Sequence, residues 1–158
     1  MTPLLSRRAF LAASAGLGAA LVAFDPRARA WLRGRDTPRL GAVPAPELDG
    51  VLLADDASRQ RFAIDAGRNA RRVPNAVLVP ASAEDVVRMV DFANRHDLRI
   101  GMRGVGHSVY GQSLVEAGVA IDSRGLRAVR MAGADEIDAM AGATWGEVAK
   151  VALAHRRM

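Results

Sequence analysis

From residue 76 onward, apolar and polar positions form blocks that predict a regular succession of strands and helices. The apolar run at 76–79 lies between Pro74 and Pro80, which is typical of a short buried strand. Similar runs predict three further strands, at 99–102, 119–122 and 137–141.

A helix is predicted directly after the first strand. Ser82 is a suitable N-cap, and Glu84 and Asp85 lie in the first turn, where the helix dipole favours acids. The spacing of the apolar residues that follow is i, i+3, i+4 and i+7, which places on one face Val86, Met89, Val90 and Ala93.

A second helix is predicted near the end of the chain. Thr144 and Glu147 have the spacing of a capping box, in which each residue's side chain satisfies the other's backbone N–H. We expect its apolar side to face a sheet through Trp145, Val148, Val151 and Ala152. The alternation of strands and helices predicts an α+β fold with α/β-like order.

Residues 103–112, which follow the strand at 99–102, are the most informative stretch. They read Arg-Gly-Val-Gly-His-Ser-Val-Tyr-Gly-Gln. Gly104 and Gly106 allow positive φ angles and a close approach to a ligand, and backbone N–H groups exposed in such a turn form an anion trap. The stretch has neither the P-loop ending nor a Gly-x-Gly-x-x-Gly register, so a plain connection with a surface histidine stays open at this point.

The loop resembles the phosphate-binding loop of FAD-linked oxidases in the vanillyl-alcohol oxidase and cytokinin dehydrogenase superfamily. In the cytokinin dehydrogenase branch this loop reads Arg-Gly-x-Gly-His-Ser-x-x-Gly-Gln. The matching positions are Arg103, Gly104, Gly106, His107, Ser108, Gly111 and Gln112.

The similarity extends over about 65–154. It includes Pro74-x-Ala76-Val77-Leu78-x-Pro80, Ser82-x-x-Asp85-Val86, Gly118-Val119-Ala120-Ile121-Asp122 and Ala141-Gly142-Ala143-x-Trp145.

The resemblance implies a PCMH-type FAD-binding domain. It implies that the FAD pyrophosphate is bound by loop N–H groups of Gly104, Val105, Gly106 and Ser108, with Arg103, Gly111 and Gln112 completing the site. It also implies that His107 can bond covalently to the 8α carbon of the flavin, a reaction in which a neutral imidazole acts as nucleophile. The activity implied is oxidation of a small-molecule substrate by hydride transfer to the flavin.

Members of the superfamily are much longer and carry a separate substrate domain, so the resemblance implies that this chain is truncated. Two functions follow as alternatives. One is the FAD-binding portion of an exported FAD-dependent oxidoreductase, and the other is a remnant or module that binds FAD without turnover. No catalytic base can be named.

The N-terminus predicts export. Ser6-Arg7-Arg8-Ala9-Phe10-Leu11 precedes an uncharged run to Phe24 and then Ala28-Arg29-Ala30, the pattern of a twin-arginine signal. We expect recognition by the twin-arginine machinery, cleavage after Ala30 and a periplasmic or extracellular location, with an uncleaved anchor as the alternative.

The expected domain boundaries follow from this signal. They are a signal peptide at 1–30, a linker and lead-in at 31–64, and the FAD-binding domain at 65–158. Within the lead-in, we expect a poorly ordered tether over 31–46 and at most a short helix in 48–62.

Composition excludes several other functions. The chain has no cysteine, so it can form no disulfide, thiolate metal site or cysteine nucleophile. Three histidines without paired ligand spacing do not predict a metal site. The net charge of +5 owes much to Arg7, Arg8, Arg27 and Arg29, and the other arginines are scattered among acids, which does not favour nucleic-acid binding.

Overall fold

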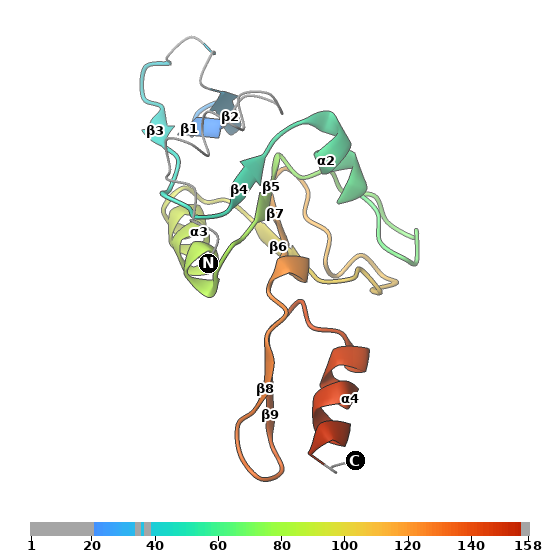
Figure 1. Ribbon diagram of the computed structural model, residues 1–158. Helices are drawn as coiled ribbons and strands as arrows, with labels where there is room; N and C mark the ends of the chain where they lie inside the picture. Colours follow the sequence, from blue (N-terminus) through green and yellow to red (C-terminus); the bar gives the residue numbers. More distant parts are fainter. Residues whose placement is uncertain (1–20, 34–35, 37–38, 156–158) are drawn as a thin grey trace.

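A four-stranded sheet forms the centre of the molecule (Figure 1). The computed structural model describes residues 21–33, 36 and 39–155. The strands of this sheet lie in the order β4 (Val51–Leu53), β5 (Ala76–Val79), β7 (Val119–Asp122) and β6 (Ile100–Arg103). β7 pairs in parallel with both β5 and β6, whereas β4 pairs antiparallel with β5 at the edge.

Helix α3 (Ala83–Arg95) connects β5 to β6 and covers one face of the central sheet. It begins after Ser82, whose side chain accepts a hydrogen bond from the Asp85 N–H, as the sequence predicts. Met89, Phe92 and Ala93 are buried. Val90, which the periodicity placed on the buried face, is 37% exposed, because the buried face is centred on Phe92.

The opposite face of the sheet is also covered. Val77 and Ala120 pack there with Phe62 and Val115, while their neighbours Leu78 and Ile121 face α3. Phe62 directly follows the short helix α2 (Asp56–Arg61). Burial on both faces explains why β5 and β7 are continuous apolar runs without alternation.

The described residues between Leu21 and Pro44 include three strands, in contrast to the tether expected over 31–46. β1 (Leu21–Asp25), β2 (Ala30–Arg33) and β3 (Val43–Pro44) form a three-stranded sheet in the order β2-β1-β3. Phe24 and Trp31 belong to the same buried cluster as Phe92. The central sheet likewise begins at β4, ahead of the boundary expected at residue 65. Proline and arginine content could not predict these long-range contacts.

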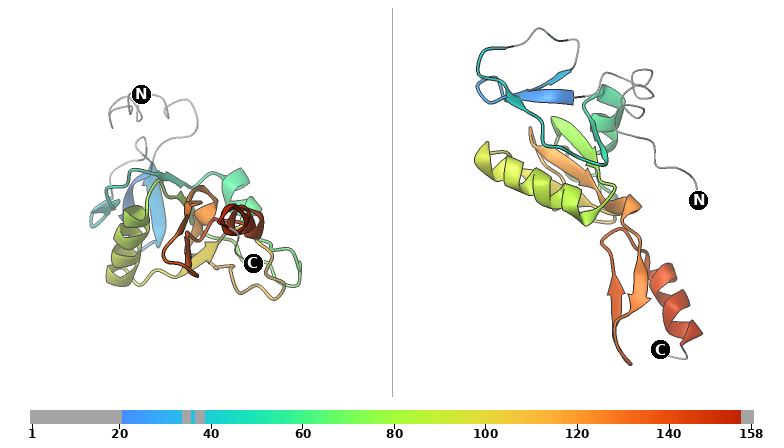
Figure 2. Two further views of the ribbon diagram at one scale, coloured as in Figure 1. Left: turned by 60° about the horizontal axis from the view of Figure 1, so that its bottom comes forward. Right: turned by 60° about the vertical axis from the view of Figure 1, so that its left-hand side comes forward.

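The C-terminal part forms an arm that extends from the end of β7 (Figures 1 and 2). It contains the 3-10 turn η1 (Ser123–Gly125), the hairpin of β8 (Val129–Met131) with β9 (Ile137–Ala139), and α4 (Trp145–Ala154). The sequence predicted β9 and α4 but missed β8. None of the described helices is long and apolar enough to cross a membrane.

Helix α4 begins with the predicted capping box between Thr144 and Glu147. It packs on the small β8–β9 hairpin and not on the central sheet. Because the hairpin covers only a narrow side of the helix, none of the α4 residues is fully buried. Trp145, expected to face a sheet, is 87% exposed.

The carboxylate of Asp85 ties the start of α3 to the segment before β4. It is fully buried and accepts hydrogen bonds from the backbone N–H groups of Asp49, Gly50 and Ala81, each at 2.8 Å. Gly50 is required at this junction, because a Cβ there would lie 2.3 Å from the Val79 carbonyl oxygen. The first-turn acid predicted for helix capping is therefore also a buried tertiary contact.

We expect Asp85→Ala to lower the free energy of unfolding by at least about 2 kcal/mol, because three backbone N–H groups lose their acceptor inside the protein. The matched control is Glu84→Ala, which removes a neighbouring acid that forms only a partly exposed pair with Arg88. It should change stability by less than about 0.5 kcal/mol. Urea unfolding checks both values, and equal midpoints for the two variants would contradict the role of Asp85.

Candidate functional site

The glycine-rich loop leaves the end of β6 and turns sharply at two glycines. Gly106 and Gly111 have φ angles of +86° and +74°, which favour glycine over residues with a side chain. Gly104, expected to share this conformation, has no positive φ. Its lack of a side chain serves close packing instead, because a Cβ there would lie 3.2 Å from the Ala141 carbonyl oxygen.

Several of the loop's carbonyl oxygens accept hydrogen bonds from a second segment, residues 65–72. The backbone N–H of Ala66 donates to the Gly106 carbonyl at 3.1 Å, and that of Gly67 donates to the Ser108 carbonyl at 3.3 Å. The Asn69 side-chain amide donates to the carbonyl of Val109 at 2.8 Å.

The loop's N–H groups differ from these carbonyls in their hydrogen bonding. In the part of the chain that the structure describes, no atom accepts a hydrogen bond from the backbone N–H groups of residues 105–108. The carbonyls of Gly106, Ser108 and Val109 are thus hydrogen-bonded within the protein, whereas four consecutive amides have no acceptor among the described residues. Such a row of N–H groups is suited to an anion, above all a phosphate.

Asp65 holds the two halves of the loop together. One of its carboxylate oxygens accepts hydrogen bonds from the Ser108 hydroxyl at 2.7 Å and from the Gly111 N–H at 2.9 Å. The side chain is buried, and the Ser108 hydroxyl and the Gly111 N–H together hold the Asp65 pKa below its ordinary value. The Ser108 hydroxyl also lies 3.0 Å from that of Ser113.

Gly67 allows the two segments to meet. A Cβ at this position would lie 2.1 Å from the Val109 carbonyl oxygen, far inside van der Waals contact. Arg72 adds a hydrogen bond from its guanidinium to the carbonyl of Gly111 at 3.0 Å. Sequence reasoning missed the role of residues 65–72, and its only signal was that the resemblance begins at Asp65.

The Arg103 side chain is directed into the protein. Its guanidinium donates to the carbonyls of Arg61 at 3.0 Å and Ile64 at 2.9 Å, at the end of α2. Its central carbon lies 4.2 Å from the centre of the Phe62 ring, a cation–π contact. Burial lowers the Arg103 pKa. This side chain anchors the loop, and Arg103 is also one of the residues that line the hollow beside the loop.

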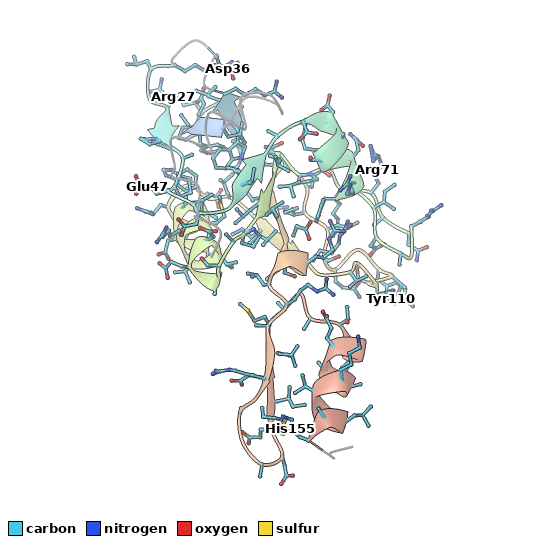
Figure 3. All side chains as sticks on the ribbon, viewed as in Figure 1. Arg27, Asp36, Glu47, Arg71, Tyr110 and His155 are labelled. Atoms are coloured by element: carbon cyan, nitrogen blue, oxygen red, sulfur yellow. The ribbon has the colours of Figure 1, made fainter. Side chains whose placement is uncertain are left out.

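Gln112 and Tyr110 also act within the loop. The Gln112 side-chain oxygen accepts a hydrogen bond from the Tyr110 N–H at 3.2 Å. Tyr110 lies at the outer end of the loop, far from His155 on the arm (Figure 3), and is 74% exposed. The structure therefore brings the predicted residues together, but Arg103, Ser108 and Gln112 contact the protein through their side chains.

An open hollow of about 580 Å³ lies between the loop and the start of α4. The loop side consists of residues 102–108 with Ser113, and the other side consists of residues 143–146. His107 lines this hollow, its side chain is exposed, and no described residue forms a hydrogen bond with its imidazole. Trp145 lies on the opposite side, so its exposure places an aromatic ring at the hollow.

The α4 side of the hollow is fixed by its capping box. The Thr144 N–H and hydroxyl both donate to the Glu147 carboxylate at 2.8 Å. With Arg127, these contacts lower the pKa of Glu147 to about 2. The described residues contain no cluster of three or more histidine or acidic side chains that could hold a metal ion.

Comparison with known proteins identifies the family. A family model described as "FAD binding domain" matches residues 74–158, which is more than half of the chain. The chain belongs to this family. FAD is accordingly the cofactor of the domain, and the resemblance inferred from the loop is confirmed.

Individual relatives agree with this assignment. Cytokinin dehydrogenase 7 of Oryza sativa subsp. japonica is 33% identical over 123 residues, a match that covers 73% of this chain and 24% of the relative. An uncharacterised oxidoreductase of the fasciation locus in Rhodococcoides fascians is 26% identical over 110 residues, covering 70% and 25% respectively. The chain thus spans about a quarter of the length of these relatives.

The fold of this FAD-binding domain also occurs in solved oxidases. The structure of 6-hydroxy-D-nicotine oxidase from Arthrobacter nicotinovorans superposes with a TM-score of 0.58 at 26% identity, covering 69% of this chain and 24% of the oxidase. The mixed helix and sheet fold expected from the sequence is therefore confirmed, as the N-terminal portion of such an enzyme.

The structure of the site fits FAD. The cofactor carries a negatively charged diphosphate, and the loop presents open N–H groups with no side chain at Gly104 or Gly106. A Cβ at Gly106 would lie 3.2 Å from the Arg103 side chain, and the φ angle of +86° there also favours glycine.

We expect Gly67→Ala to weaken FAD binding more than about tenfold, because the added methyl group forces the loop away from residues 65–72 and disturbs its row of N–H groups. Gly133→Ala is the matched control, since its nearest neighbour would be 3.9 Å away. Titration of each purified protein with FAD, followed by flavin fluorescence, measures both affinities. Equal affinities for the two variants would show that the close contact at Gly67 does not support the site.

The stability that Asp65 contributes should depend on pH. Because its pKa in the folded protein lies below the ordinary value of 3.8, the contribution is complete above that value and is lost as the pH falls through the folded pKa. Wild type should therefore exceed Asp65→Asn in unfolding midpoint at neutral pH, and the difference should shrink below about pH 4. The control is Asp91→Asn, which removes a carboxylate on the exposed side of α3. A constant difference for Asp65→Asn would argue against an ionised carboxylate in the loop.

Proposed function

We propose that this chain forms the FAD-diphosphate-binding part of an exported oxidoreductase that oxidises a small-molecule substrate. The observation that carries the proposal is the row of open N–H groups at residues 105–108, held by hydrogen bonds from residues 65–72. When bound, FAD supplies the acceptor for the hydride that leaves the substrate. The residues of this chain bind and orient the cofactor.

In this proposal the backbone N–H groups of Val105, Gly106 and Ser108 hold the diphosphate, together with the region around Gly104. The start of α4 lines the same hollow, but the Glu147 carboxylate that caps this helix offsets the partial positive charge of its N-terminal end. The loop amides are therefore the groups proposed to bind the phosphate oxygens.

His107 is the proposed point of covalent attachment. Its imidazole is exposed at the hollow and makes no hydrogen bond with the described residues, so either ring nitrogen is available. The lining contains no carboxylate and no second histidine. His107 is thus the one strong neutral nucleophile that the described lining offers to an electron-poor ring system.

The same lining bears on catalysis. Apart from His107 and Arg103, its polar side chains are Ser108, Ser113, Thr144 and the indole of Trp145. None of these is a strong base at neutral pH. We therefore propose that these residues hold the cofactor, and that deprotonation of the substrate is not their task.

Export is proposed separately, from sequence alone. The support is the twin-arginine pattern at Arg7 and Arg8, followed by an uncharged run. These residues lie outside the described part of the chain. The proposed location is the periplasm or the extracellular space.

We expect His107→Ala to lose covalently retained flavin, because it removes the imidazole nucleophile that the described lining offers. Intact mass under denaturing conditions should show wild type with one FAD and His107→Ala without it. His155→Ala, at the end of α4 and outside the hollow, is the control and should retain the cofactor.

Two outcomes separate the parts of this proposal. Flavin that stays attached to denatured His107→Ala would contradict the assignment of the anchor. Wild type that binds FAD reversibly but never covalently would disprove attachment while leaving the diphosphate site intact. Substrate-dependent bleaching of bound flavin would support an oxidoreductase, and its absence with substrates of the relatives would favour a binding module without turnover.

A further inference from the structure

The N-terminal hairpin of β1 and β2 overlaps the end of the expected signal peptide. β1 spans Leu21–Asp25 and β2 begins at Ala30, the residue after which cleavage was expected. Cleavage there would separate the two strands, which pair antiparallel from Asp25 and Ala30 to Leu21 and Arg33. The β1–β2 hairpin and cleavage after Ala30 therefore exclude each other, because cleavage would remove β1.

Aromatic contacts make β1 part of the main core. Phe24 is fully buried, and its ring lies 5.1 Å from that of Trp31 and 6.1 Å from that of Phe92. Trp31 stacks on Phe92 at 5.5 Å. Removal of residues 1–30 would remove Phe24, the ring that contacts both Trp31 and Phe92.

The turn between the strands is also held on both sides. The Asp25 carboxylate accepts hydrogen bonds from the N–H groups of Arg27 at 3.0 Å and Ala28 at 3.1 Å. These contacts and the Arg39 guanidinium hold the Asp25 pKa below its ordinary value. The backbone at the expected cleavage motif is therefore folded back on itself.

Contacts with distant residues anchor the same turn to the domain. The Arg29 carbonyl accepts a hydrogen bond from the Asn75 side-chain amide at 2.9 Å, next to β5. The Arg29 guanidinium donates to the backbone carbonyl and the carboxylate of Asp97, beyond the end of α3. A protease needs an extended, accessible strand of backbone, and these contacts remove the motif from that conformation.

We propose that residues 21–30 are retained in the mature protein as a structural hairpin, so that any signal cleavage occurs before Leu21. This inference rests on the proposed export. A twin-arginine substrate folds before it is transported, and the hairpin forms as part of that fold. The cleavage motif at Ala28-Arg29-Ala30 is then held in the folded turn and the start of β2 when the processing enzyme acts.

The test is the intact mass of the full-length product recovered from the exported fraction of a bacterium with a twin-arginine pathway. Ala28→Gln gives the readout, because Ala28 is exposed in the turn and a large side chain at this place blocks recognition of an Ala-x-Ala site. We expect the same processing in both proteins, with a mature mass that differs by the alanine-to-glutamine increment. That shift shows directly that Ala28 is present in the mature chain.

Other outcomes overturn the inference. A mature mass equal to residues 31–158 in wild type would do so, as would accumulation of uncleaved precursor only in Ala28→Gln. Replacement of Arg7 and Arg8 by lysine tests export itself. If wild type is never exported, the export proposal fails. Whether the hairpin is part of the fold is then tested on the full-length protein from the cytoplasm.

For that protein, Phe24→Ala should lower the thermal unfolding midpoint clearly, while Leu40→Ala, which alters a side chain that is 95% exposed, should not. An unchanged midpoint for Phe24→Ala would show that the hairpin is not part of the fold.

Discussion

The carboxylate of Asp65 is the contact on which the site depends. Its two hydrogen bonds, to the Ser108 hydroxyl and the Gly111 N–H, close the glycine-rich loop over the segment that precedes β5. The carbonyls of Gly106 and Ser108 accept hydrogen bonds from the same segment, through the N–H groups of Ala66 and Gly67. The N–H groups of residues 105–108 are left without an acceptor among the described residues.

This arrangement divides the work of the motif between side chains and backbone. The Arg103, Ser108 and Gln112 side chains all bond to the protein and set the shape of the loop. The backbone N–H groups of residues 105–108 have no acceptor among the described residues, and these are the groups that we propose bind the cofactor. His107 differs from its neighbours, because its side chain is the one that faces the hollow without a protein partner. Most of the polar side chains of this motif thus determine the conformation of the loop.

A second group of contacts connects the periphery to the same core. Phe24 and Trp31 join Phe92 on α3, and the Asp85 carboxylate fixes the start of α3 to the segment before β4. α3 in turn lies between β5 and β6, and β6 leads into the loop. The N-terminal strands therefore contribute to the stability of the element that delivers the loop, although they lie outside the site.

The sequence by itself determined the local elements. Ser82 and Thr144 specified helix starts through hydrogen bonds within a few residues, and the apolar runs of β5 and β7 specified buried strands. The loop was recognisable because glycines and a histidine at fixed spacing report a backbone conformation, and the family followed from it. These are all short-range properties, which the order of residues encodes directly.

Only the tertiary structure decided which distant residues met. Asp65 and Gly67 became part of the site through contacts with residues about forty positions away. Phe24, which the sequence placed at the end of a signal peptide, lies in the core. The Arg103 guanidinium donates to the carbonyls of Arg61 and Ile64, and Trp145 is exposed. Each outcome depends on packing and hydrogen bonding across the fold, for which neither periodicity nor composition carries a signal, because the partners are brought together only by the chain's path in space.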